Sequence, residues 1–98
     1  MSDDPSSIDL VIQTASGVLT GRFAPREAVT ILAAQAPQAR AQAAVVAERA
    51  PQRGERYAEL LRSIAAELAK QGHEGREEPW AVRAVVQELE RVVAALTG

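Results

Sequence analysis

The spacing of the large apolar residues constrains the fold of this chain more than any other feature. The spacing is clearest in the segment 79–98, where seven residues fall at the a, d and e positions of a heptad: Val82, Val85, Val86, Leu89, Val92, Val93 and Leu96. Steps of three and four place side chains on one face of an α-helix, whereas a half-buried strand alternates apolar and polar residues. Similar stripes run through the earlier segments, and twenty of the 98 residues are alanine. The sequence therefore predicts an all-α protein, a small bundle of four to five closely packed helices.

The length of the chain is that of a single domain. Residues 1–5 are expected to be disordered, and 6–98 to form one helical domain. Ser6 or Ser7 is a natural N-cap for the first helix, because a serine hydroxyl accepts a hydrogen bond from an unpaired backbone N–H of the first turn. Gly21 is expected to end this helix.

Prolines divide the next part of the chain. Pro25 is well placed to begin the second helix, since its missing N–H would have no partner in the first turn, and Phe23 is expected to staple that start. Pro37 disfavours helical geometry in the residue before it, and a third helical segment, 37–50, follows. The sequence leaves open whether Pro37 kinks one long helix or separates two.

The last two helices are expected to form an antiparallel hairpin. The fourth starts near Gly54 or Glu55 and ends at Gly72, a common C-cap residue. The polar turn 72–79 then leads to Pro79, which begins the final helix. Short connections of this kind join antiparallel neighbours in helix bundles.

Charge and composition argue against several classes of protein. The formal net charge is −2, and it is spread evenly over both halves of the chain. A nucleic-acid-binding protein normally carries a basic face, and a membrane span needs about 20 consecutive apolar residues. No such feature is evident, and the acidic start of the chain is unlike a signal peptide. The protein is therefore predicted to be cytoplasmic. Its alanine and its excess of arginine over lysine favour a bacterial origin.

No combination of residues points to catalysis. The chain has no cysteine, and His73 is its sole histidine. His73 lies beside Glu74, Glu77 and Glu78 in the polar turn, a grouping better explained as solvated side chains and acids that favour the start of the following helix. We therefore expect no enzymatic activity, no metal site and no cofactor.

Protein–protein interaction is the function that the sequence favours. Seven large apolar residues on the last helix are many for so small a domain to bury, and small helical proteins often bury such residues by association. Trp and Tyr are enriched in binding hot spots. We therefore predict a homodimer, or a complex with another protein, with an interface made of the seven residues named above together with Trp80 and Tyr57. The alternative is a helix-turn-helix-like DNA-binding regulator that uses residues 25–50, with Gln38, Arg40, Gln42 and Arg49 as its polar groups.

Overall fold

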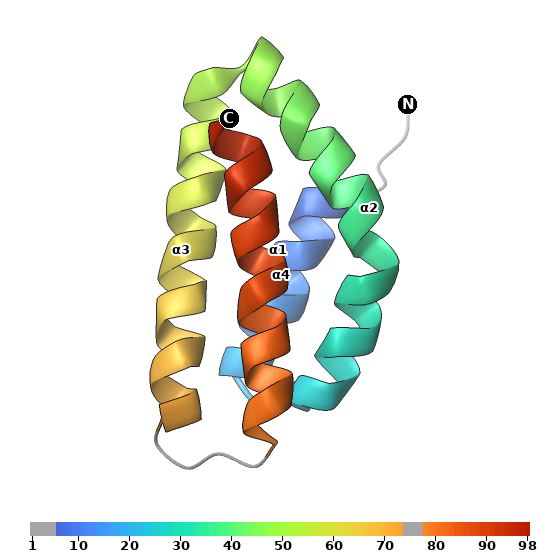
Figure 1. Cartoon of the computed structure of the whole chain (residues 1–98), viewed down its shortest axis with the longest axis vertical. Helices are drawn as coiled ribbons and strands as arrows, with labels where there is room; N and C mark the ends of the chain where they lie inside the picture. Colours follow the sequence, from blue (N-terminus) through green and yellow to red (C-terminus); the bar gives the residue numbers. More distant parts are fainter. Residues whose placement is uncertain (1–5, 74–77) are drawn as a thin grey trace.

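The structure is a bundle of α-helices. It is a computed structural model that describes residues 6–73 and 78–98, with the backbone alone at 72 and 73. The described residues form four helices: α1 (Ser7–Leu19), α2 (Pro25–Arg49), α3 (Pro51–His73) and α4 (Pro79–Thr97) (Figure 1). The predicted all-α class is confirmed. The predictions for residues 1–5 and for most of the polar turn fall outside the described residues.

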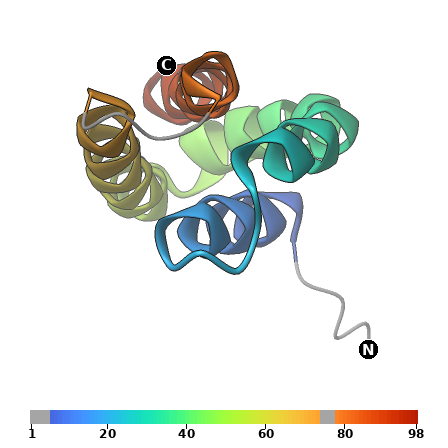
Figure 2. The same ribbon diagram turned by 90° about the horizontal axis from the view of Figure 1, so that it is seen from below.

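The final helix, α4, is packed between two others. It lies beside both α2 and α3 and is in contact with each to a similar extent, whereas it barely touches α1. Seen along the bundle, α1 and α4 lie on opposite sides, and α2 and α3 complete the ring (Figure 2). The last two helices run in opposite directions side by side (Figure 1). Their predicted antiparallel pairing is therefore confirmed in part, because α4 packs against α2 to a similar extent.

The core combines large side chains from all four helices with small ones, which predominate on α2. Fully buried large residues are found on every helix: Ile8, Val11, Val18, Leu32, Leu61, Leu68, Val82, Val85, Leu89 and Val92. The other buried residues of α2 are all alanine: Ala28, Ala36, Ala39 and Ala43. Because alanine has little bulk, neighbouring helices can approach the α2 backbone closely from both sides.

The second and third predicted helices are one helix. Pro37 lies inside α2 and is exposed, while Ala36 beside it is buried. A proline in a helix removes one backbone hydrogen bond and bends the helix away from its ring. With the ring on the solvent side, the bend follows the curvature of α2 over the bundle (Figure 1). Pro37 therefore curves the helix and does not end it.

The break between helices occurs at Ala50, and α3 begins earlier than predicted. Ala50 has φ −144° and ψ 65°, outside the helical region. Pro51 then opens α3, because proline is well suited to the first helical position, so α3 does not start at Gly54 or Glu55. Gly54 is buried within the first turns, and a Cβ on it would lie 3.2 Å from the carbonyl oxygen of Leu96. The glycine therefore allows the end of α4 to come close to α3.

The turn between α1 and α2 is held by Phe23. Its ring lies directly over Gly17 of α1, where a Cβ would overlap the ring atoms. The backbone N–H of Phe23 donates to the carbonyl oxygen of Gly17 at 3.1 Å. Phe23 thus packs on α1, and its role as a staple at the start of α2 stays a prediction. Ser6 is the N-cap of α1, as expected, and its hydroxyl accepts from the Asp9 N–H at 3.1 Å.

Candidate interaction site

Most of the apolar residues predicted to form an interface lie inside the chain's own core. Five of the nine are buried, with exposed fractions of 2% or less: Val82, Val85, Leu89, Val92 and Leu96. They are buried because α4 has a neighbouring helix on each side. In this fold these five side chains offer almost no surface to another molecule, although Val82 and Leu96 border surface depressions.

The remaining four predicted residues are accessible, but the structure does not bring all of them together. Val86 and Val93 are half-buried on the side of α4 that faces α3, and Trp80 is 52% exposed near the start of α4. Tyr57 is half-buried on the other side of α3, in a depression with Arg53, Arg56 and Leu60. Tyr57 therefore does not share a surface with the α4 residues.

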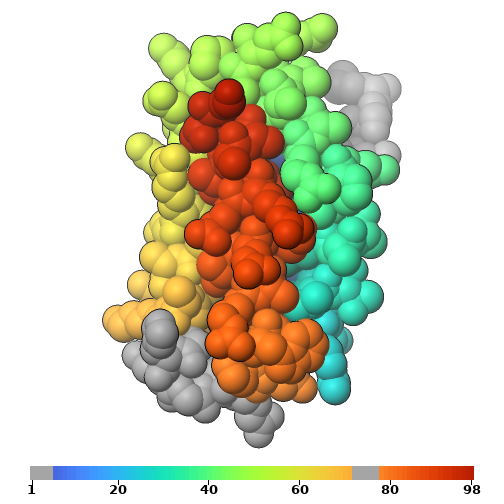
Figure 3. All heavy atoms as spheres, in the orientation of Figure 1, coloured from blue at the N-terminus to red at the C-terminus, as the bar shows by residue number. Residues whose placement is uncertain are grey.

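A shallow groove lies between α3 and α4. It consists of two adjoining depressions of about 280 and 470 Å³, which share Ala69, Val86 and Glu90. Figure 3 shows the face of the molecule on which α4 lies. We call this surface the α3–α4 groove; its lining is mostly apolar and comprises Ala65, Ala66, Ala69, Pro79, Val82, Val86, Val93 and Ala94, with Arg62, Arg83, Gln87 and Glu90 as its polar members.

Three charged side chains of the α3–α4 groove, Arg62, Arg83 and Glu90, have no ion-pair partner among the described residues. All three are exposed, Arg62 on α3 and the other two on α4. Within residues 6–73 and 78–98 the ion pairs are Arg26–Glu78 at 3.6 Å and Arg91–Glu88 at 2.9 Å.

The sequence analysis missed the α3 side of this groove. Arg62, Ala66 and Ala69 follow one another at steps of four and three, which places them on one face of α3. Their spacing is the signal in the sequence that marks this face. Because their side chains are small or charged, they do not form a stripe of large apolar residues, and the face was not predicted.

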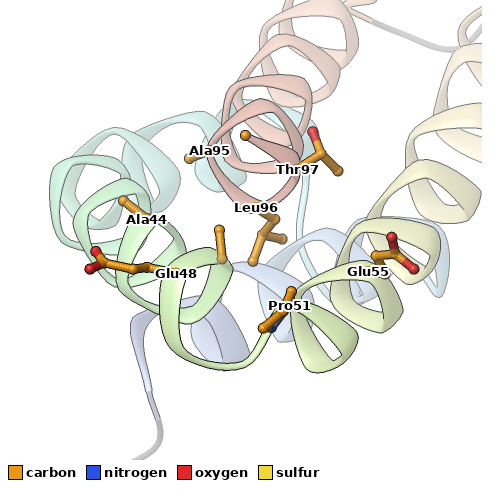
Figure 4. Close-up of a pocket in the computed structure, with 9 residues that line it drawn as sticks. Ala44, Glu48, Pro51, Glu55, Ala95, Leu96 and Thr97 are labelled. Carbon is orange, nitrogen blue, oxygen red and sulfur yellow. The ribbon is translucent and has the colours of Figure 1, made fainter.

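A second cleft lies where the end of α4 meets the corner between α2 and α3. It has a volume of about 400 Å³ and is lined by alanines, Pro51, Leu96, Thr97, Gly98 and two glutamates. Glu48 and Glu55 lie on opposite sides of this cleft, and their carboxylates do not point toward each other (Figure 4). The two carboxylates therefore do not form a close pair that could share a proton.

Within residues 6–73 and 78–98, no group of three or more side chains that could hold a metal ion occurs. The grouping of His73 with Glu74 and Glu77 lies outside the described side chains, whereas Glu78 forms the ion pair with Arg26. None of the helices described is both long and apolar enough to span a bilayer.

The segment proposed for DNA recognition contains no turn. Pro25–Arg49 is one continuous helix, whereas a helix-turn-helix motif needs two helices set at an angle. Two of its four polar groups hold α1 in place. The Ile8 N–H donates to Oε1 of Gln42 at 3.0 Å, and the Ser7 hydroxyl donates to Oε1 of Gln38 at 3.3 Å. These side chains stabilise the bundle, and the segment does not form the geometry that the DNA-binding hypothesis needs.

Similarity to known proteins does not add to this description. No family model matches the chain, and the comparisons with curated proteins and with solved structures give no significant match. The candidate site therefore depends on the geometry of the α3–α4 groove and on the charges beside it.

Proposed function

We propose that this protein is a non-catalytic helical interaction module that self-associates through the outer face of its C-terminal helix. The observation that carries the proposal is the α3–α4 groove, in which Val86 and Val93 remain half-buried with no described element covering them. Covering such a groove removes apolar surface from water, and this is the main favourable term in most protein association. Of the nine residues predicted for the interface, the proposal keeps Val86, Val93 and Trp80.

The shape of the α3–α4 groove suits a helical partner. A channel between two helices that lie side by side accepts a third helix, whose side chains enter at intervals of three and four residues. Ala66, Ala69 and Ala94 line the channel, and their small side chains permit a close approach. Trp80 is 52% exposed nearby, and tryptophan is among the residues that contribute most to protein interfaces.

The proposal is tested by measuring the solution mass of the protein by light scattering over a range of concentrations. We expect the wild-type mass to rise from 10.4 kDa toward twice that value as the concentration increases. The double variant Val86→Lys/Val93→Lys is expected to remain a monomer, since charged groups in the groove oppose its burial. The long lysine side chains can still direct their ammonium groups to solvent, so the fold is expected to survive.

The chain offers a matched control for this experiment. Val45 is 49% exposed on α2, outside the groove, so Val45→Lys introduces the same residue elsewhere and is expected to associate like the wild type. A wild-type chain that stays monomeric at all concentrations contradicts the proposal. So does a double variant that associates as strongly as Val45→Lys. Substituting the buried Val85 or Leu89 would instead test folding.

A further inference from the structure

We propose that the occupant of the α3–α4 groove is a second copy of this chain, placed antiparallel about a two-fold axis near Val86 and Gln87, so that Arg83 of each copy pairs with Glu90 of the other. This inference rests on the proposed function and specifies its partner and geometry. Most soluble homo-oligomers are symmetric dimers, in which one surface patch must complement itself. The positions of the charges on α4 meet that requirement in one orientation.

The two charges lie on nearly the same side of α4. Arg83 and Glu90 are seven residues apart, which corresponds to almost two complete helical turns and about 10.5 Å along the axis. Both side chains contribute to the same depression of the groove, and neither has an ion-pair partner among the described residues of its own chain. A two-fold axis midway between them brings each arginine level with the glutamate of the other copy, so that one rotation forms two opposite-charge pairs.

The same rotation also matches the apolar residues. It brings Trp80 level with Val93 of the second copy, and Pro79 level with Ala94. Trp80 is the most exposed of the large apolar residues that the structure describes, and Val93 is half-buried in the groove. The apolar ends of the surface thus meet each other, while the charged pairs lie nearer the axis.

A parallel arrangement of two copies is disfavoured by the same charges. It would place each Arg83 beside its own equivalent, and each Glu90 likewise. Like charges placed opposite one another oppose binding in that orientation. The charge pattern of α4 therefore selects the antiparallel dimer.

Charge reversal tests this geometry. In Arg83→Glu each substituted residue faces Glu90 of the other copy, so both pairs become glutamate–glutamate. In Glu90→Arg both pairs become arginine–arginine. Each single variant is expected to weaken the dimer by about tenfold or more, as judged from the strength of exposed ion pairs and their repulsive counterparts. The double variant Arg83→Glu/Glu90→Arg restores both opposite-charge pairs, so its dissociation constant is expected to return to within about threefold of wild type.

Two further variants control for the change in net charge. Arg53→Glu and Glu48→Arg make the same reversals at exposed positions outside the α3–α4 groove, and they are expected to leave the dissociation constant unchanged. Circular dichroism verifies that every variant is folded. The dissociation constants themselves come from sedimentation equilibrium.

Cysteine cross-linking gives an independent measurement, because the wild-type chain contains no cysteine. Gln87 lies beside the proposed axis, so Gln87→Cys should form a covalent dimer under mild oxidation. Arg83→Cys should not, because its two copies would be separated by about 10.5 Å along the helices, beyond the reach of a disulfide. In a parallel dimer both variants would cross-link.

The outcomes separate this inference from the function on which it rests. A monomeric wild type overturns both. A wild-type dimer whose single charge reversals behave like Arg53→Glu, or whose double variant is not restored, overturns the antiparallel geometry and leaves self-association standing. Cross-linking of Arg83→Cys would likewise overturn the antiparallel geometry and leave self-association standing.

Discussion

Truncation of Leu89 to alanine tests whether the apolar stripe of α4 belongs to the core of a single chain. Leu89 is completely buried, and α4 packs against both α2 and α3. Replacing a buried leucine by alanine costs about 2–5 kcal/mol, and the loss is larger where the surroundings cannot close the cavity. On the α2 side the buried residues are mainly alanines, which have no rotamers with which to fill the space. We therefore expect a loss of about 3–5 kcal/mol in the free energy of unfolding.

A loss of that size is a large part of the total for a domain of this length, which is about 5–15 kcal/mol. It should lower the melting temperature by more than about 10 °C. Urea unfolding followed by circular dichroism measures it, and Leu60→Ala is the matched control because Leu60 is 45% exposed. That variant should lose less than about 1 kcal/mol. A loss below about 1 kcal/mol for Leu89→Ala, or one that disappears as the protein is diluted, would refute the placement of this stripe in the intrachain core.

Two further substitutions test local features of the bundle. Gly17→Ala is expected to lower the unfolding free energy by about 1 kcal/mol, because overlap with the Phe23 ring outweighs the better helix propensity of alanine; an unchanged or higher melting temperature would contradict this. Pro37→Ala is expected to raise the unfolding free energy, by up to about 3 kcal/mol, because an exposed proline inside a helix costs about that much relative to alanine. A lower stability of this variant in urea would mean that the packing of α2 requires the bend.

Apolar spacing predicted the helices well but not their partners. The stripe on α4 identified Val85, Leu89 and Val92 as a buried face, and the structure confirms that they are buried. The spacing along one helix shows which side avoids water, but it carries no information on whether a neighbour from the same chain or from another covers that side. The stripe was predicted to contact a second molecule because the ability of α2 to cover α4 was underestimated. An alanine-rich helix offers few large residues, yet it brings its backbone close enough to cover α4.

The predicted boundaries of α2 and α3 and the predicted start of α4 depended on how the prolines were interpreted. At Pro25 and Pro79 a proline at the first helical position was predicted correctly. Pro37 looks the same in sequence, but its exposed ring allows the helix to continue through a bend. Pro51 begins α3, and the helical start near Gly54 was placed too late. The pyrrolidine ring fixes φ at a proline, but tertiary packing decides whether the helix ends there or continues through a bend.

The candidate site was only partly accessible to prediction. Val86, Val93 and Trp80 were identified from their residue types, while Arg83 and Glu90 gave no signal because charged residues on a helix are usually solvated. Their proposed role depends on two facts that only the three-dimensional structure shows: they border the α3–α4 groove, and neither is paired within the described residues. The α3 side of the groove could not be predicted from the sequence either, because its residues line a groove only once α3 lies beside α4.

The central position of α4 also determines when this bundle can form during synthesis. Ribosomes deliver α1, α2 and α3 first, and until α4 emerges α2 and α3 are covered by α1 on one side of the bundle only. The contacts that close the core join α4 to α2, across a long stretch of chain, and such distant pairings form late because loop closure must precede them. The nascent polypeptide is therefore expected to acquire its tertiary packing in one late cooperative step. Until then the apolar residues of the growing chain are open to the chaperones and other nascent chains around it.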